Sequence, residues 1–136
     1  MDNEKSLVLI KPDAVKKKLI GRIIQMYEEN GLIIEDMYMT EANLETLEKH
    51  YEEHSERDFF KTLLNFMTSG PICALLVSGS NAVKVIREIN GATNPAKARP
   101  GTIRYLFGTT VQKNAVHGSA NIEDAQKELK IWFNLE

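Results

Sequence analysis

The uninterrupted apolar run Ile72-Cys73-Ala74-Leu75-Leu76-Val77 predicts a buried β-strand near the middle of the chain. Two shorter apolar runs, at 7–10 and 32–34, predict two further strands. A weaker fourth strand is indicated by Ala115-Val116, just before His117. The segments between these strands determine the rest of the fold.

Those segments carry apolar residues at helical spacing. Ile20, Ile23 and Tyr27 share one face of the first predicted helix, and two helical patches, at about 43–54 and 58–68, follow the second strand. Strands that alternate with helices predict α/β layers. The pattern alone fits both a parallel sheet and a split βαβ sandwich of the ferredoxin type. Candidate N-caps precede three of the helices, at Asn43, Asn81 and Asn121.

Length and composition exclude several classes of protein. The 136 residues are about the length of one domain, so we expect a single domain over 1–136. Seventeen Lys and Arg oppose nineteen Asp and Glu, and the net charge of −2 excludes a strongly basic nucleic-acid-binding protein. The single cysteine, Cys73, excludes an internal disulfide, and its apolar neighbours indicate a buried thiol.

No segment of the sequence has the pattern of a signal peptide or a membrane span. Residues 1–5 include acidic side chains and lack an apolar core, and no apolar run approaches the ~20 residues that cross a bilayer. We therefore expect a cytoplasmic protein that does not insert into membranes.

The segment from Asn90 to Asn114 is a long Gly- and Pro-containing loop, and structureless loops of this length are usually functional. No Asp or Glu occurs between Ile89 and Ile122. A solvated basic loop would explain this bias, and so would an anion site, because nearby carboxylates would repel the ligand. The few cations suit a small polyphosphate better than duplex DNA. Both glycine-rich phosphate motifs are absent, so side chains would have to bind it. The candidates are Lys97, Arg99, Arg104, Lys113 and His117.

The stretch His50-Tyr51-Glu52-Glu53-His54 has the H-x-x-E-H spacing of a zinc site. Two histidines at i and i+4 can share a metal from one helix face, but the third ligand would have to come from elsewhere. The alternative is a mostly solvated helix face with one histidine turned toward a site.

A histidine ends the fourth predicted strand, within Asn114-Ala115-Val116-His117-Gly118-Ser119. His117 lies in the acid-free segment, beside a predicted helix N-terminus that favours anions. Gly118 lets the backbone turn and leaves one flank of the imidazole open. A neutral imidazole in this position is a candidate nucleophile near pH 7.

Seven short motifs follow one another along the whole chain. They are Lys11-Pro12-Asp13, Gly21-Arg22-Ile23-Ile24, Tyr51-x-x-His54 with Arg57-Asp58-Phe59-Phe60, Thr68-Ser69-Gly70-Pro71, Gly91-Ala92-Thr93-Asn94-Pro95, Pro100-Gly101-Thr102-Ile103-Arg104 and Asn114-Ala115-Val116-His117-Gly118-Ser119. Each motif is weak alone. Their order and spacing together resemble the nucleoside diphosphate kinase family.

The resemblance implies a fold, a reaction and a metal. The fold is a ferredoxin-like α/β (α+β) sandwich, with a four-stranded antiparallel sheet covered by helices. The reaction is ping-pong: a nucleoside triphosphate gives its γ-phosphoryl group to a histidine, and a nucleoside diphosphate collects it. Mg²⁺ is carried by the nucleotide phosphates rather than by protein ligands. The resemblance also implies a homo-oligomer built from dimers, commonly a hexamer and sometimes a tetramer.

The resemblance also assigns roles to single residues of this sequence. His117 matches the phosphorylated histidine, Glu128 the carboxylate that holds its other ring nitrogen, and Ser119 a serine that supports this pair. Tyr51 matches a tyrosine packed beside the histidine. The residues that match contacts to the ribose and the phosphate end are Lys11 and Asn114, and those that match phosphate ligands are His54, Arg57, Arg87, Thr93 and Arg104. Phe59 and Val111, with Leu63 nearby, match a base clamp that reads no edge groups, so ATP, GTP and other nucleotides are all expected substrates.

The sequence departs from the family pattern at three places. Ala120 replaces an aspartate after His-Gly-Ser, which removes a carboxylate near the phosphates. Asp58 replaces a proline, and Tyr105 and Leu106 replace Gly-Asp, which places two large apolar side chains in a surface turn. An enzyme is the leading interpretation. The alternatives are a module of the same fold that has lost turnover, which only Ala120 supports, and a nucleic-acid-binding protein that uses the basic loop.

Overall fold

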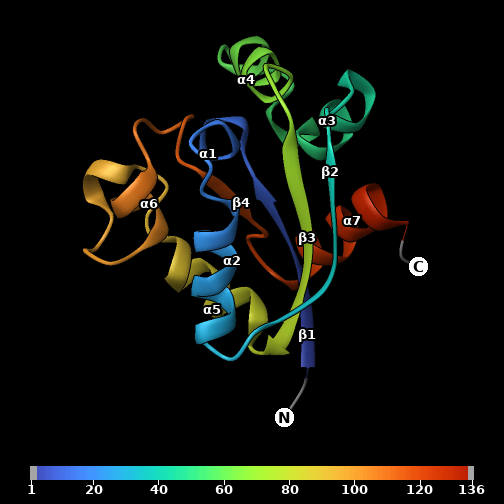
Figure 1. The fold of residues 1–136 in the computed structure, drawn as a ribbon. Coiled ribbons are helices and arrows are strands. Elements are labelled where there is room, and N and C mark those ends of the chain that lie inside the picture. The colour runs from blue at the N-terminus through green and yellow to red at the C-terminus, as the bar shows by residue number, and fades with distance from the viewer. Residues whose placement is uncertain (1–2, 135–136) are drawn as a thin grey trace.

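The computed structural model describes residues 3–134 and contains one four-stranded sheet (Figure 1). The strand order is β2-β3-β1-β4, and every neighbouring pair is antiparallel. This arrangement is the ferredoxin-like sandwich that the family resemblance implied, and it excludes the parallel sheet that periodicity alone left open. The strands are β1 (Asn3–Ile10), β2 (Ile33–Thr40), β3 (Ile72–Ser80) and β4 (Val116–Gly118).

Helices cover both faces of the sheet, which explains why the central strands carry the uninterrupted apolar runs 7–10 and 72–77. Val8 and Leu75 pack on one face with α2 and α5, which lie side by side, whereas Leu9 and Leu76 pack on the other with α3, α4 and α7 (Figure 1). The buried thiol of Cys73 is in the first of these cores, as its neighbours indicated. The long helices are α2 (Ile20–Glu29), α3 (Leu44–His50), α4 (Phe60–Met67), α5 (Ala82–Asn90) and α7 (Ile122–Phe133).

Two of the three predicted N-caps hold in the structure. Asn43 Oδ1 accepts from the backbone N–H of Thr46 at 2.8 Å, and Asn121 Oδ1 accepts from that of Asp124 at 2.8 Å. Asn81 also precedes its helix, but its side chain makes no cap. Its backbone adopts the left-handed conformation, with φ of 56°, which asparagine tolerates better than most residues.

The segment 90–114 is more ordered than the sequence predicts. It contains the 3₁₀ helix η2 (Pro95–Lys97) and the short helix α6 (Ile103–Phe107). Side chains cap both, since Asn94 accepts from the N–H of Ala96 and Thr102 from that of Tyr105. Helices of one turn are too short to give a periodic pattern, so the expectation of a structureless loop was wrong. The same limit hid α1 (Pro12–Lys16). The helical patch predicted at 43–54 is divided, because α3 ends at His50 and the 3₁₀ helix η1 (Glu52–His54) follows it.

The strand bounds place the candidate nucleophile inside the sheet rather than after it. His117 is the middle residue of β4 and pairs with Leu9 of β1. Cross-strand partners share a face, so the His117 side chain lies on the face that carries α7. At the other edge, β2 is longer than predicted and exposes Ile33, Met37 and Met39. Within residues 3–134, no helix has the length and apolar character needed to cross a membrane.

Candidate active site

A cleft of about 680 Å³ lies beside His117. Its walls come from the turn between α3 and α4, the end of α5 with the following loop, α6, the segment 111–114 and β4. The predicted site residues that line this cleft are Lys11, Tyr51, His54, Phe59, Leu63, Arg87, Thr93, Arg104, Val111, Asn114 and His117.

His117 is anchored from behind the cleft by α7. Its Nε2 lies 2.8 Å from Glu128 Oε1, and Ser119 Oγ donates to the same oxygen at 2.7 Å. Ser119 Oγ also accepts from the backbone N–H of Leu7 in β1 at 3.3 Å. Neither Glu128 nor Ser119 lines the cleft. The sheet and α7 together therefore fix one side of the imidazole and leave the other side to the cleft.

The charge of Glu128 determines which ring nitrogen of His117 is free. Burial acts to raise the pKa of Glu128, but the hydrogen bond and charge of His117, together with the charge of His50 and the Ser119 hydrogen bond, outweigh it, so this pKa lies below its usual range. The ionised carboxylate can only accept hydrogen bonds. It therefore keeps the proton of a neutral His117 on Nε2 and leaves the lone pair on Nδ1.

Lys11 and Asn114 form a buried polar contact in the cleft wall. Lys11 Nζ donates to Asn114 Oδ1 at 2.8 Å, and Asn114 Nδ2 donates to the carbonyl oxygen of Thr93 at 2.9 Å. Burial, then the guanidinium of Arg104, lowers the pKa of Lys11 to about 8. The ammonium is thus held where water is scarce, and an anion that entered the cleft would meet a poorly solvated positive charge.

Two guanidinium groups add to this positive charge. Arg104 donates to the carbonyl oxygens of Gly91 and Val116, each at 2.8 Å, which leaves its buried Nε unpaired. Arg87 lines the same cleft. Burial and the nearby charge of Arg87 both lower the pKa of Arg104. None of the described residues that line the cleft is acidic. The lining of the cleft is therefore positively charged, which suits an anionic ligand. Arg104 and His117 of the acid-free segment contribute to this lining, whereas Lys97, Arg99 and Lys113 do not.

Two apolar side chains lie at the same cleft. Phe59 is 46% exposed and Val111 is 56% exposed, although both are large hydrophobic residues. Both line the cleft together with buried Leu63. Two exposed apolar side chains beside a cationic cleft suit a ligand that has a flat ring at one end and phosphates at the other.

The zinc interpretation of residues 50–54 fails on local structure. Helix α3 ends at His50 and η1 covers Glu52–His54, so the two histidines do not lie at i and i+4 of one helix. His54 lines the cleft, and the half-buried His50 lies against His117 outside the cleft lining. Tyr51, between them, has a buried hydroxyl without a hydrogen-bond partner on the cleft wall.

Arg57 is the one phosphate ligand assigned from the family resemblance that does not line the cleft. It is exposed in the turn before α4. Other residues line the cleft without having been predicted; they are Asn90, Gly91, Ala92, Gln112, Gly118 and Ala120. Gly118 allows a close approach rather than a turn, since a Cβ there would lie 2.8 Å from Asn90 Nδ2. The glycine next to His117 was the one feature of the sequence from which this close approach to Asn90 could have been predicted.

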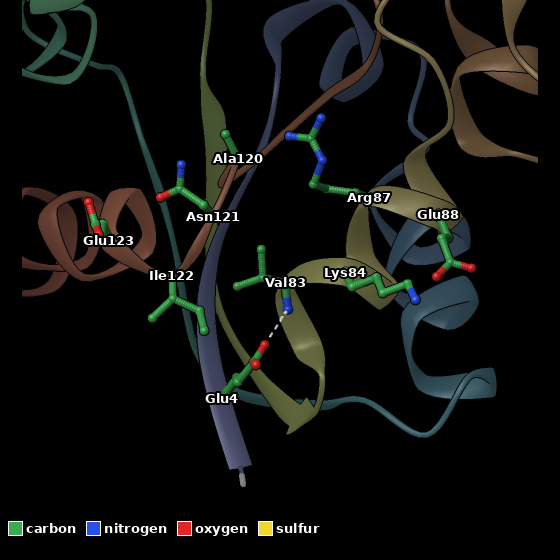
Figure 2. A pocket seen from close by; sticks show the side chains of 9 residues that line it. All are labelled: Glu4, Val83, Lys84, Arg87, Glu88, Ala120, Asn121, Ile122 and Glu123. Atoms are coloured by element: carbon green, nitrogen blue, oxygen red, sulfur yellow. Dashed lines mark hydrogen bonds between the residues drawn. The ribbon is translucent and has the colours of Figure 1, made fainter.

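A second cleft, of about 880 Å³, meets the first at Arg87 and Ala120 (Figure 2). The carboxylate of Glu4 accepts there from the backbone N–H of Val83 at 3.2 Å. Glu88 and Glu123 also line it. Its acidic side chains make it a poorer site for a polyphosphate than the cleft at His117.

Comparisons with known proteins show the family to which this chain belongs. The family model described as nucleoside diphosphate kinase matches residues 4–136. A nucleoside diphosphate kinase of Clostridium perfringens is 52% identical over 130 residues, which cover 96% of this chain and 91% of that protein. A crystal structure of the Aquifex aeolicus nucleoside diphosphate kinase superposes with a TM-score of 0.94 at 38% identity, covering 97% of this chain and 96% of that one. That of the Encephalitozoon cuniculi enzyme has a TM-score of 0.94 at 42% identity, covering 96% of this chain and 88% of that one. The chain therefore belongs to the nucleoside diphosphate kinase family.

Proposed function

We propose that His117 Nδ1 carries the phosphoryl group in the nucleoside diphosphate kinase reaction of this chain. The observation that carries the proposal is the bond between His117 Nε2 and the ionised Glu128, which leaves Nδ1 as the nucleophilic nitrogen. In the first half-reaction, the Nδ1–P bond forms and the bond from phosphorus to the β,γ-bridging oxygen breaks. The nucleoside diphosphate leaves with that electron pair. A second nucleoside diphosphate reverses these steps through its terminal phosphate oxygen.

Glu128 supports the intermediate electrostatically. Phosphorylation of a neutral imidazole on Nδ1 leaves the ring with a positive charge, which the carboxylate on Nε2 opposes. Ser119 keeps the carboxylate in place through its 2.7 Å hydrogen bond. A module of this fold that had lost turnover would not need an intact His117–Glu128 pair, so the pair favours an active enzyme.

The cations of the cleft are the phosphate ligands in this proposal. Lys11, Arg87 and Arg104 supply positive charge around the phosphoryl group. In the transition state, the negative charge of that group is spread over its three equatorial oxygens, which these cations stabilise. Tyr51 offers an unpaired hydroxyl, and Asn114 fixes the ammonium of Lys11. The remaining assigned ligands are His54 and Thr93, which line the cleft, and Arg57, which would have to turn inward from its exposed position.

Kinases of this class act on nucleotides with a divalent metal, and we propose Mg²⁺ here. The described residues of the cleft offer no carboxylate, and Ala120 stands where the family pattern has an aspartate. Hard oxygen ligands for the ion would therefore come from the nucleotide phosphates and from water. When bound, the ion would neutralise charge on the phosphate oxygens while Lys11 and the arginines orient them.

The order of the two half-reactions provides a direct kinetic test. Initial rates measured at several fixed concentrations of donor and acceptor are expected to give parallel double-reciprocal lines, because the first product leaves before the second substrate binds. Intersecting lines would indicate a ternary complex and would contradict a phosphoenzyme.

We also propose that the chain works as a single domain in the cytoplasm, since the family model spans 4–136 and free nucleotides are the substrates.

We predict weak discrimination among bases. Phe59 and Val111 offer area to any base but no group that reads a base edge. We expect kcat/KM for ATP, GTP, CTP and UTP as donors to agree within about 100-fold, whereas an edge-reading site can discriminate by ~10⁴–10⁵-fold. In Phe59→Ala, KM should rise by a similar factor for all four. A preference above ~10⁴-fold would show that an edge-reading group acts on the base.

We further propose that the chain is a homo-oligomer, a hexamer rather than a tetramer. An assembly built from dimers, whether hexamer or tetramer, needs two different interfaces, and the structure exposes apolar side chains on two separate elements. The hexamer is preferred because the family resemblance implies it as the commoner form. Tyr105 and Leu106 on α6 are 52% and 48% exposed, and they do not fold back onto their own core. The second set lies on edge strand β2, at Ile33, Met37 and Met39.

The double variant Tyr105→Gly/Leu106→Asp is expected to weaken assembly. Burial of one leucine contributes ~1.5–3 kcal/mol per subunit, so sedimentation at low micromolar concentration should show a smaller mass. The Tm should fall by roughly 5 °C as dissociation exposes α6. The control is Leu44→Asp, an exposed leucine on α3, which should keep the native mass. An unchanged mass in the double variant would exclude α6 from the interface.

A further inference from the structure

His50 lies directly behind the candidate nucleophile. It is the last residue of α3, and its ring centroid is 4.6 Å from that of His117 with the planes at 77°. It meets Tyr51 edge-on as well, at 4.5 Å. Neither His50 nor Trp132 lines the cleft. His50 therefore contacts the nucleophile without a position from which to contact substrate.

Trp132 fixes the proton of His50. The indole Nε1–H donates to His50 Nδ1 at 3.0 Å. An indole nitrogen can only donate, so Nδ1 must present its lone pair and a neutral His50 carries its proton on Nε2. Trp132 is itself held, because its carbonyl oxygen accepts from the Tyr38 hydroxyl of β2 at 2.6 Å. The orientation of His50 is thus tied to α7 and, through it, to the sheet.

The same hydrogen bond argues against a metal at this cluster. His50, His117 and Glu128 each place a ligand-type atom within 4.8 Å of the others. His50 Nδ1 is already occupied by the indole N–H, and Nε2 holds the remaining proton. Glu128 is bonded to His117 and Ser119. Hydrogen bonds, rather than an ion, account for the arrangement.

The surroundings keep His50 uncharged. Burial, then the charge of a protonated His117, lowers the pKa of His50 to about 3, against a smaller raising effect of Glu128. Lys11 and His54 act in the same direction as His117. The titratable groups that face His50 are these and Tyr51. Near pH 7, His50 is therefore a neutral ring whose edge or face meets His117.

We propose that His50 and Trp132 are positioning residues for His117: the Trp132 hydrogen bond holds a neutral His50 in one tautomer and one orientation, and the edge-to-face contact of that ring fixes the plane of the His117 imidazole. The inference rests on the proposed role of His117 and extends it. An imidazole held only by the Glu128 hydrogen bond could still rotate about that bond. Contact with His50 removes this freedom and keeps Nδ1 in line with the incoming phosphorus.

The test compares Trp132→Phe, His50→Gln and His50→Leu with Phe133→Leu as control. Trp132→Phe removes the N–H and retains an aromatic ring. His50→Gln can still accept from the indole, whereas His50→Leu cannot. Phe133 packs on Tyr38 at the same end of α7, whereas the described ring contacts of His50 are with Tyr51, His117 and Trp132. Each variant is measured for the rate of protein phosphorylation by ATP, for kcat and for KM.

The proposal expects kcat and the phosphorylation rate to fall by about five- to tenfold in Trp132→Phe, as for loss of one neutral hydrogen bond, with KM within twofold. His50→Leu should fall further, His50→Gln should recover most of the loss, and Phe133→Leu should keep the parent rate. Imidazole nitrogen shifts in Trp132→Phe should show mixed tautomers at His50. Equal rates in Trp132→Phe and the parent, or equal losses in Trp132→Phe and Phe133→Leu, would overturn the positioning role. Label on His117 in the parent tests the proposed function separately, so the two failures are distinguishable.

Discussion

Replacing His117 by Ala is expected to abolish phosphoryl transfer, with kcat/KM for exchange between ATP and a nucleoside diphosphate lower by at least ~10⁴-fold. The other groups on the cleft wall are poor substitutes for its Nδ1. The ammonium of Lys11 is hydrogen-bonded to Asn114, and burial raises the pKa of the Tyr51 hydroxyl. Loss of the nucleophile therefore leaves the phosphate ligands in place with nothing to receive the phosphoryl group.

The variant should remain folded and should still bind nucleotide. Glu128 keeps its hydrogen bond from Ser119 when the imidazole is gone, so we expect a change in Tm of no more than a few degrees. Circular dichroism reports the fold, and calorimetric titration with ADP reports binding. His54→Ala removes another histidine of the cleft wall, an assigned phosphate ligand; its KM should rise, but, unlike His117→Ala, it should still form the phosphoenzyme. Retained transfer in His117→Ala would remove the assigned nucleophile.

Glu128→Gln is expected to lower kcat by about tenfold and to change nucleotide affinity by less than twofold. The amide can still accept from His117 Nε2 but no longer carries the charge that opposes a cationic phosphohistidine. Hydrogen bonds to charged groups contribute about 1 kcal/mol more than neutral ones, which corresponds to a factor of roughly five to ten in rate. Steady-state kinetics and equilibrium binding of ADP separate the two effects.

Glu123→Gln is the control for this variant. Glu123 lies in the first turn of the same helix, outside the cleft at His117, and its loss removes the same charge from α7. It should keep the parent kcat. A loss of ADP affinity in Glu128→Gln, with kcat unchanged, would contradict the orienting role and would place the carboxylate in substrate binding.

The strands and long helices of this chain follow from sequence because each gives a strong local pattern. The run 72–77 is apolar at every position because β3 is buried on both faces, and the stripe of α2 repeats over several turns. Periodicity says nothing about the order in which strands pair, so the antiparallel sheet depended on the family resemblance. The one-turn helices α1, η2 and α6 escape such patterns, since three to five residues hold too few repeats.

The same difference between local patterns and distant contacts applies to the residues of the site. An acid-free segment and a histidine before a predicted helix point to an anion site with His117 inside it, and the cleft has that charge. Contacts between segments that are far apart in the sequence leave no local pattern from which they could be predicted. Glu128 without the resemblance would read as a solvated helix residue, and His50 belonged to a motif that suggested zinc. Only the packing of α3 on α7, and of α7 on β1 beside β4, brings both of them to His117.

Isolation of the phosphorylated protein tests the central claim most directly. The chain is incubated with Mg²⁺ and γ-labelled ATP without acceptor, freed of nucleotide, and digested to locate the label. We expect about one acid-labile phosphoryl group per chain, on His117, which passes to added GDP and is recovered as labelled GTP. Label on another residue, or rapid formation of GTP from ATP and GDP without any labelled protein, would contradict the account.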